Sequence, residues 1–239
     1  MNPTTTLGSS LLLFLFGLLL SANAQPSSIP DHYQLLYEQD FEEEVRLSEF
    51  EMTDPTAWTI HEVEDNQVLE LAGKSQYKPR VRSPFNIAFI KERMFGDFVL
   101  EVQLAQTGRE YGHRDMCLFF GMKDPSNFYY VHTASVADPH AHNVFLVNDE
   151  PRVAIAEKTT EGADWGATGD WHTMRIERNI AEGSIRVYFD DLSEPIMVAK
   201  DTHFMEGFIG FGSFDDTGRV DNIKIWGPAS PPQGFGFFR

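Results

Sequence analysis

Histidine and carboxylate side chains gather in the middle of the chain. Four of the eight histidines, His113, His132, His140 and His142, lie within thirty residues, and Asp115 accompanies them. In an extended segment His140 and His142 would point to the same side, because side chains alternate across a strand. These residue types ligate transition metals, so His113, Asp115, His140 and His142 form a candidate metal site, and His132, His140 and His142 are candidate catalytic residues. The other interpretation is that these imidazoles are solvated or paired with a nearby acid.

Tyr130 and His132 are two positions apart in a predicted strand, so they face the same side of the sheet. On a concave face they would form a stacking and hydrogen-bonding platform for a sugar ring, with Trp165 or Arg82 beside them. The alternative is that Tyr130 packs in the core with its hydroxyl group at the rim.

Basic residues concentrate in one stretch of a chain whose formal net charge is −17. Six lie within twenty residues in which Glu92 is the only acid: Lys74, Lys78, Arg80, Arg82, Lys91 and Arg93. They are either solvated cations at a strand edge or a landing site for a carboxylated or sulfated ligand, with Arg80 and Arg82 as candidate ligand-binding residues. The overall acidity makes nucleic acid an improbable partner, because it repels a phosphate backbone.

Strands must position these side chains. Residues 116–122 and 128–133 are apolar and aromatic runs separated by a turn-forming segment, which predicts a hairpin, and residues 144–147 predict a third strand beside it. Residues 98–104 alternate with a period of two, and further strands are predicted at 37–41, 58–61, 68–71, 80–82, 153–156, 171–177, 185–189, 196–199, 208–211 and 220–226. Residues 86–94 predict a short helix or a loop. The whole pattern favours an all-β fold with two packed antiparallel sheets.

Both ends of the chain lie outside this pattern. Ten apolar residues, Leu11 to Leu20, precede Ala22-Asn23-Ala24, which predicts a signal peptide over residues 1–24 and a secreted protein. The apolar run is too short to span a bilayer. We expect one domain over residues 25–227 and a Pro- and Gly-rich tail over 228–239. A single cysteine, Cys117, excludes an internal disulfide.

Two stretches resemble the concanavalin A-like lectin and glucanase superfamily, whose fold is a β-jelly-roll sandwich. They are Gly96-Asp97-Phe98-Val99-Leu100-Glu101-Val102, and Gly207-Phe208-Ile209-Gly210-Phe211 followed by Arg219-Val220-Asp221-Asn222-Ile223-Lys224-Ile225. Within the superfamily the chain is most similar to bacterial secreted domains of the laminin G-like and 3-keto-disaccharide hydrolase-like kind. The resemblance implies a structural calcium ion held by Asp221, with Asp40 on the neighbouring strand assisting.

The resemblance also limits the enzymatic possibilities. A retaining laminarinase needs an E-x-D-x-E strand that places its carboxylates on one face, and the chain contains no such strand. A 3-keto-disaccharide hydrolase-like enzyme would instead use a transition metal as a Lewis acid, with a histidine or carboxylate removing a proton beside the ketone.

Three functions therefore stay open. The first is a glycan-binding module that engages an oligo- or polysaccharide on its concave face. The second is a metal-dependent, 3-keto-disaccharide hydrolase-like enzyme that cleaves glycosides. The third is a structural or adhesive envelope protein.

Overall fold

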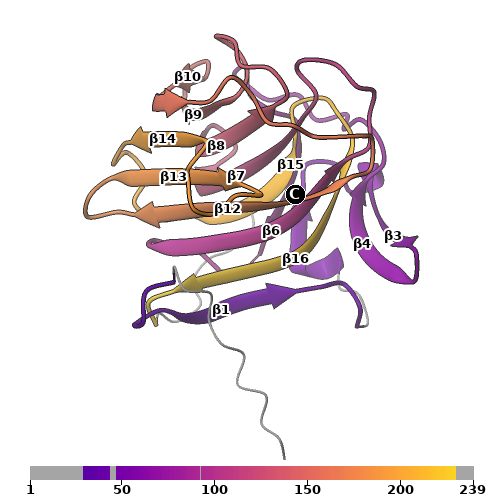
Figure 1. Ribbon diagram of the computed structural model, residues 1–239, viewed down its shortest axis with the longest axis horizontal. Helices are drawn as coiled ribbons and strands as arrows, with labels where there is room; N and C mark the ends of the chain where they lie inside the picture. Colours follow the sequence, from indigo (N-terminus) through magenta and orange to yellow (C-terminus); the bar gives the residue numbers. More distant parts are fainter. Residues whose placement is uncertain (1–28, 44–46, 92, 230–239) are drawn as a thin grey trace, which may run out of the picture.

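Two antiparallel sheets make up the computed structural model, which describes residues 29–43, 47–91 and 93–229 (Figure 1). The nine-stranded sheet contains β1 (Gln34–Gln39), β3 (Trp58–Val63), β4 (Asn66–Leu71), β6 (Phe98–Gln106), β11 (Ala156–Thr159), β12 (Trp171–Asn179), β13 (Ser184–Phe189), β14 (Met197–Lys200) and β16 (Gly218–Gly227). The seven-stranded sheet contains β2 (Phe50–Met52), β5 (Asn86–Ile90), β7 (Asp115–Asp124), β8 (Asn127–Ala134), β9 (Asn143–Asn148), β10 (Val153–Ala154) and β15 (Phe208–Ser213).

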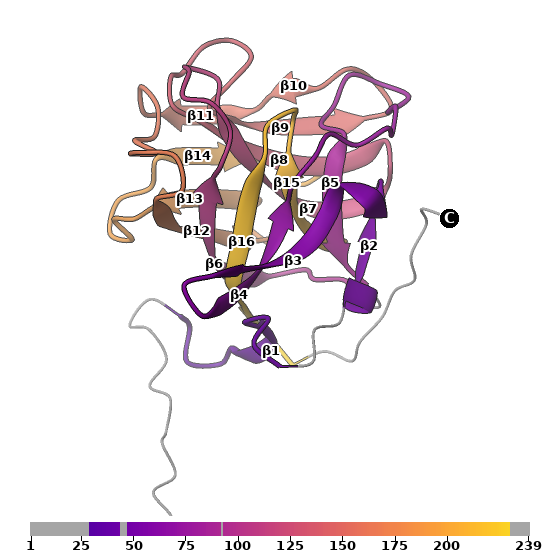
Figure 2. The same cartoon turned by 90° about the vertical axis from the view of Figure 1, so that its right-hand side faces the viewer.

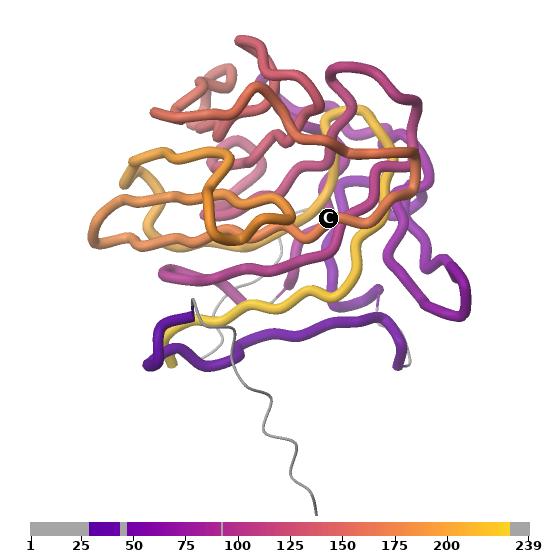
Figure 3. The backbone as a smooth tube through the Cα atoms, in the orientation of Figure 1, coloured from indigo at the N-terminus to yellow at the C-terminus, as the bar shows by residue number. Residues whose placement is uncertain are grey.

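The two sheets pair distant parts of the chain. Strands β1 and β16, from opposite ends of the domain, run side by side, as the traced backbone shows (Figure 3). In the seven-stranded sheet the order is β10-β9-β8-β7-β15-β5-β2, so the predicted central hairpin and its third strand lie together (Figure 2). Two short 3-10 helices, η1 (Leu47–Glu49) and η2 (Pro55–Ala57), complete the elements of the described residues. The all-β, two-sheet prediction is confirmed.

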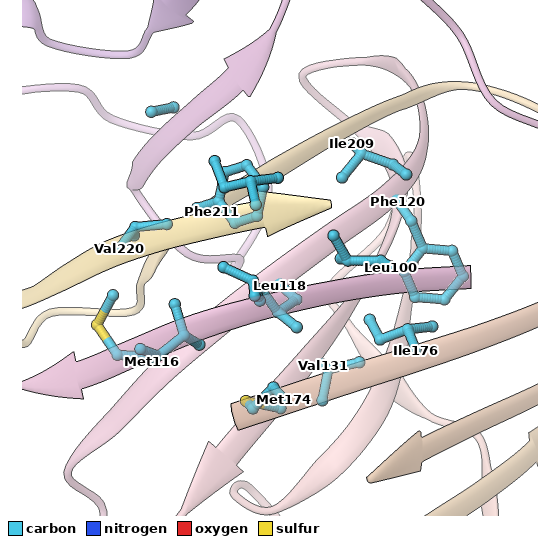
Figure 4. Close-up of a cluster of buried hydrophobic side chains, with 14 of the residues drawn as sticks. Leu100, Met116, Leu118, Phe120, Val131, Met174, Ile176, Ile209, Phe211 and Val220 are labelled. Carbon is cyan, nitrogen blue, oxygen red and sulfur yellow. The ribbon is translucent and has the colours of Figure 1, made fainter. Parts of the chain in front are cut away.

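Apolar side chains from the facing sides of the two sheets form the main core. Leu100 and Ile176 of the nine-stranded sheet meet Leu118, Phe120 and Val131 of the seven-stranded sheet (Figure 4), and none of these side chains is more than 1% exposed. The alternation predicted for residues 98–104 holds on β6, because Phe98, Leu100, Val102 and Leu104 enter this core. Each such side chain contributes ~1.5–3 kcal/mol relative to an exposed position.

Two local predictions were wrong. Residues 86–94 were predicted as a short helix or a loop, but Asn86–Ile90 is strand β5, paired with β15 on one side and β2 on the other. It is buried along its length, so apolar residues occupy both faces and the period of two disappears. Residues 80–82 were predicted as a strand, but they lie in bends of the connection between β4 and β5.

A second apolar cluster covers the outer face of the seven-stranded sheet. Its buried members are Ile87, Phe89, Cys117, Phe119, Met122, Phe128, Tyr130, Phe145, Val147 and Phe208. The connection between β4 and β5, residues 72–85, which we call the crossover loop, lies over this face, because its Val81 packs on the cluster. The face expected to be open and concave is therefore largely filled.

The predicted domain limits meet the described residues only in part. The predicted signal peptide, residues 1–24, lies outside them, and so does most of the predicted tail, residues 230–239. None of the helices in the described part of the chain has the length and apolar character needed to cross a bilayer.

Candidate functional site

Three polar side chains meet on the outer face of the β7–β8 hairpin. Asp115 and Cys117 are two positions apart on β7, so both point to this face, and His132 on β8 is the cross-strand partner of Cys117. Asp115 and Cys117 have no exposed surface, and His132 is 4% exposed. We call these three residues the β7–β8 polar cluster.

Hydrogen bonds fix the orientation of the β7–β8 polar cluster. The Cys117 thiol donates to Oδ2 of Asp115 at 2.9 Å. Nε2 of His132 lies 3.3 Å from the same oxygen, yet it makes no hydrogen bond to any described residue. Nδ1 of His132 lies 3.3 Å from the carbonyl oxygen of His140, so this nitrogen carries the ring proton that is donated. The unused nitrogen of the imidazole therefore faces the carboxylate and the thiol.

Charge and burial shift the pKa values of Asp115 and Cys117 in opposite directions. Burial alone would raise the pKa of Asp115, but the neighbouring His132 outweighs it and the pKa lies below its ordinary value. Burial, together with the Asp115 charge, raises the pKa of Cys117 well above 9. A thiol in this state is not a nucleophile near neutral pH, because the thiolate is the reactive form. The cluster is thus unsuited to cysteine-based nucleophilic catalysis.

An arginine and three aromatic rings close the cluster from outside. The guanidinium group of Arg152 lies 4.6 Å from the ring centre of Phe145 and 4.7 Å from that of Phe214. It donates to the Tyr130 hydroxyl at 2.5 Å and to the carbonyl oxygen of His140 at 2.7 Å. Sequence reasoning missed Arg152, because it follows a turn, where arginine is commonly solvated.

The other predicted metal ligands do not join the cluster. His113 and His140 are exposed, and the His113 side chain pairs with Asp138. His142 is buried and its Nε2 lies 2.9 Å from Oγ1 of Thr160. His140 and His142 were expected to point the same way, but His142 has φ of 55° and follows a tight turn over residues 138–141, so the segment is not extended. The four histidines therefore do not converge.

The predicted sugar-binding residues also separate. Tyr130 and His132 do share a face, with ring centres 6.4 Å apart, but Tyr130 has no exposed surface and its ring stacks on Phe119 and Phe145. Trp165 lies in the main core between the sheets and donates through Nε1 to the carbonyl oxygen of Thr133 at 2.9 Å. The alternative prediction, in which Tyr130 packs in the core, describes its position, and neither Tyr130 nor Trp165 offers an open ring surface to a sugar.

Arg80 and Arg82, by contrast, lie at the surface of the crossover loop. Arg80 pairs with Asp149 and lies 3.4 Å from the Ser126 hydroxyl, and so ties the loop to the turn after β9 and to the turn between β7 and β8. The guanidinium group of Arg82 lies 5.8 Å from the ring centre of Phe214. Both side chains are exposed and accessible to a ligand.

A pocket opens within the same loop. It has a volume of about 370 Å³ and is lined by Lys74, Ser75, Gln76, Tyr77, Lys78, Pro79 and Phe85. Lys74 lies 5.0 Å from the ring centre of Phe85. The loop is held in shape by backbone hydrogen bonds from Ser75 to the Asn86 side chain at 2.8 Å and from Gln76 to Asp54 at 2.9 Å. Two partly exposed aromatic rings and two lysines thus surround one hollow.

The residues expected to hold calcium lie where β1 meets β16. Asp221 is buried, and its oxygens accept hydrogen bonds from the side-chain amides of Asn66 and Asn222, both at 3.0 Å. Burial raises the pKa of Asp221, and the charges of Glu42 and Asp40 add to this effect. Among the described residues, Asp40, Glu42 and Asp221 do not form a group whose ligand atoms all lie within 4.8 Å of one another, and the calcium ion stays a prediction.

The two antiparallel sheets form an all-β sandwich, and the crossover loop on its outer face contains a pocket large enough for a small ligand. No protein-family model and no curated protein matches the chain. Solved structures do share its fold. Carbohydrate-binding module CBM66 from Bacillus subtilis is 19% identical, with 75% of this chain and 96% of that chain covered at a TM-score of 0.51.

Two further neighbours have the same fold. Domain 4 of AbnA, a GH43 extracellular arabinanase from Geobacillus stearothermophilus solved with arabinotriose, is 12% identical, covering 84% of this chain and 96% of that chain at a TM-score of 0.51. Lectin I-B4 from Griffonia simplicifolia is 12% identical, covering 79% and 98% at a TM-score of 0.51. These similarities show the two-sheet jelly-roll fold that the sequence resemblance predicted.

Proposed function

We propose that this protein is a secreted glycan-binding jelly roll whose ligand occupies the pocket of the crossover loop. The observation that carries the proposal is the pocket itself, where Tyr77 and Phe85 offer partly exposed ring surface between Lys74 and Lys78. Aromatic rings pack on the apolar faces of sugars, while flanking polar groups orient the ring. The volume of about 370 Å³ lies within the range of small-ligand sites, so it suits one or two sugar units.

The charges around the pocket favour an acidic sugar. Lys74, Lys78 and Arg82 carry positive charge, and the sequence has no acidic residue between Leu71 and Lys91. The whole chain carries a formal charge of −17, so this loop is the exception on an acidic molecule. Local positive charge attracts carboxylated or sulfated glycans and loses strength as salt screens it.

The accessibility of the two candidate sites supports glycan binding over the enzymatic alternative. A metal-dependent, 3-keto-disaccharide hydrolase-like enzyme would place its chemistry at the β7–β8 polar cluster, the place where a carboxylate, a thiol and an imidazole meet. These groups are at most 4% exposed, and beside them Arg152 packs on the Phe145 ring and donates to the Tyr130 hydroxyl. A sugar ring would reach them only after neighbouring side chains moved, whereas the crossover-loop pocket is open.

Glycan binding by purified variants tests the proposal. Wild-type chain and Tyr77→Ala, Lys78→Ala and double variants are screened against carboxylated, sulfated and neutral oligosaccharides, and hits are measured by calorimetry. We expect each substitution to weaken binding of an acidic glycan about 5- to 10-fold at low salt, which is ~1 to 1.4 kcal/mol. The loss caused by Lys78→Ala should shrink as salt rises, because salt screens the charge that this substitution removes.

Lys158→Ala serves as the matched control, since Lys158 is an exposed lysine on β11 of the other sheet. The proposed binding pocket would be refuted if Lys158→Ala lowered glycan affinity as much as the pocket substitutions do. It would also be refuted if Tyr77→Ala and Lys78→Ala left glycan affinity unchanged. Failure to bind any glycan, with capture of envelope proteins instead, would favour the structural or adhesive alternative. N-terminal sequencing of exported protein tests removal of residues 1–24.

A further inference from the structure

We propose that Asp115, Cys117 and His132 bind one divalent transition-metal ion of the zinc type. The inference is independent of glycan binding, because it concerns side chains that the crossover-loop pocket does not contain. Their ligand atoms, a carboxylate oxygen, Sγ and an imidazole nitrogen, all lie within 4.8 Å of one another. Thiolate, imidazole and carboxylate are the three ligand types that zinc takes in proteins.

The separations are close to those of a tetrahedral site. Zinc binds sulfur at ~2.3 Å and nitrogen or oxygen at ~2.0 Å, so neighbouring ligands stand roughly 3.3 to 3.6 Å apart. Here Asp115 Oδ2 is 2.9 Å from Cys117 Sγ and 3.3 Å from His132 Nε2. Cys117 Sγ and an imidazole nitrogen of His132 lie within 4.8 Å of each other, so small movements within ordinary rotamers would seat the ion. The fourth position is left for water or for the second oxygen of Asp115.

The second observation is the ring nitrogen that faces this point. Nε2 of His132 is buried and lies 3.3 Å from Asp115 Oδ2 without the geometry of a hydrogen bond, so its one close polar neighbour is another of the proposed ligands. Nδ1 of the same ring donates to the carbonyl oxygen of His140, which is the arrangement by which proteins orient a metal-ligating imidazole. Nε2 therefore faces the carboxylate and the thiol, and a metal ion bound there would replace its pairing with Asp115.

Neighbouring groups also hold the carboxylate. Asp115 accepts hydrogen bonds from the Ser213 hydroxyl and from the backbone N–H of Phe214, both at 3.3 Å. These contacts tie the β7–β8 hairpin to the segment after β15. Binding would release one proton from the Cys117 thiol, which becomes the thiolate ligand. Because all three ligands are buried, the ion would act as a structural staple of the hairpin.

Cobalt titration tests the assignment, since thiolate-bound cobalt(II) has a near-ultraviolet charge-transfer band. The purified full chain is stripped with chelator and refolded from urea with cobalt(II), because buried ligands load most readily during folding. We expect one cobalt per chain, a thiolate band, and displacement of cobalt by zinc. Cys117→Ser should remove the band, and His132→Gln should weaken binding at least tenfold.

Asp215→Asn is the control, because exposed Asp215 is not one of the three proposed ligands but forms, with Asp115 and Asp216, the alternative carboxylate group that could hold an ion. It should leave the band unchanged. Absence of a thiolate band in refolded wild-type chain overturns the proposal without reference to any variant. A band that persists in folded Cys117→Ser, or that disappears in Asp215→Asn, overturns it as well.

Discussion

Acid should destabilise the protein through one buried imidazole, that of His142. Its side chain is 1% exposed, and burial lowers its pKa from 6.5 to about 4. Between these two pH values the unfolded chain binds a proton at this residue and the folded chain does not, so stability rises with pH across the window. The contribution is fully present above pH 6.5 and is lost as the pH falls toward 4. Since one pH unit is worth about 1.4 kcal/mol, the full loss is about 3 kcal/mol.

Urea unfolding of wild-type and His142→Asn chains at several pH values between 7.5 and 4.5 measures this effect. Asparagine suits the replacement, because it tolerates the left-handed backbone of this position, φ of 55°. At pH 7.5 we expect the variant to be the less stable protein by ~1 kcal/mol, since it alters the contact with Thr160. At pH 4.5 the wild type should have lost about 2 to 3 kcal/mol more than the variant.

His140→Asn is the matched control, because His140 is exposed and lies two positions away. It should follow the wild-type curve. A difference between wild type and His142→Asn that stays constant from pH 7.5 to 4.5 would refute the reasoning, since it would mean that the imidazole titrates alike in the folded and unfolded chains.

Three further changes have defined outcomes. Calcium should raise the melting temperature in a manner that chelator reverses, and Asp221→Asn should abolish the rise; a melt indifferent to calcium contradicts the predicted site. Arg175→Met should cost about 2–4 kcal/mol in urea unfolding, because it leaves the Glu101 carboxylate, 3.0 Å from Arg175 Nε, without its buried partner. Gly212→Ala should lower the melting temperature by about 5 °C or more, because the added Cβ would lie 1.9 Å from the backbone carbonyl oxygen of Asn86 on the neighbouring strand β5. Gly73→Ala should change the melting temperature little, because no atom lies within 4 Å of the added Cβ.

The sequence predicted the fold well, because a strand that is half buried shows a period of two. Phe98 to Leu104 alternate on β6, and the central hairpin is punctuated by turn residues, so both were located correctly. The prediction failed for β5, where burial on both faces removes the alternation. The sequence pattern did not reveal the second apolar cluster on the outer face, which buries the other side of β5. Strand patterns cannot show which loop covers a sheet.

The site was harder to predict, because parity gives the face of a side chain but not what lies over that face. Parity placed Tyr130 and His132 together correctly, yet Arg152, which covers them, approaches from a turn after β9. The pairing of His132 with Cys117 depends on the register between β7 and β8, and the sequence alone leaves that register open. The positive φ of His142 likewise could not be predicted from the residues around it.

The proposed metal site and the proposed glycan pocket share the outer face of one sheet, and their connection is itself testable. The backbone N–H of Arg152 lies 3.4 Å from the carbonyl oxygen of Arg82, so the residue that covers the β7–β8 polar cluster also contacts the crossover loop. Removing a metal would free the hairpin to shift, and Arg152 would carry part of that shift to the loop. Glycan affinity should then fall modestly in metal-free protein, while Tyr77→Ala leaves metal affinity unchanged. Because thermodynamic coupling is symmetric, saturating glycan should tighten metal binding by the same factor, and a change in one affinity without the matching change in the other would refute the connection.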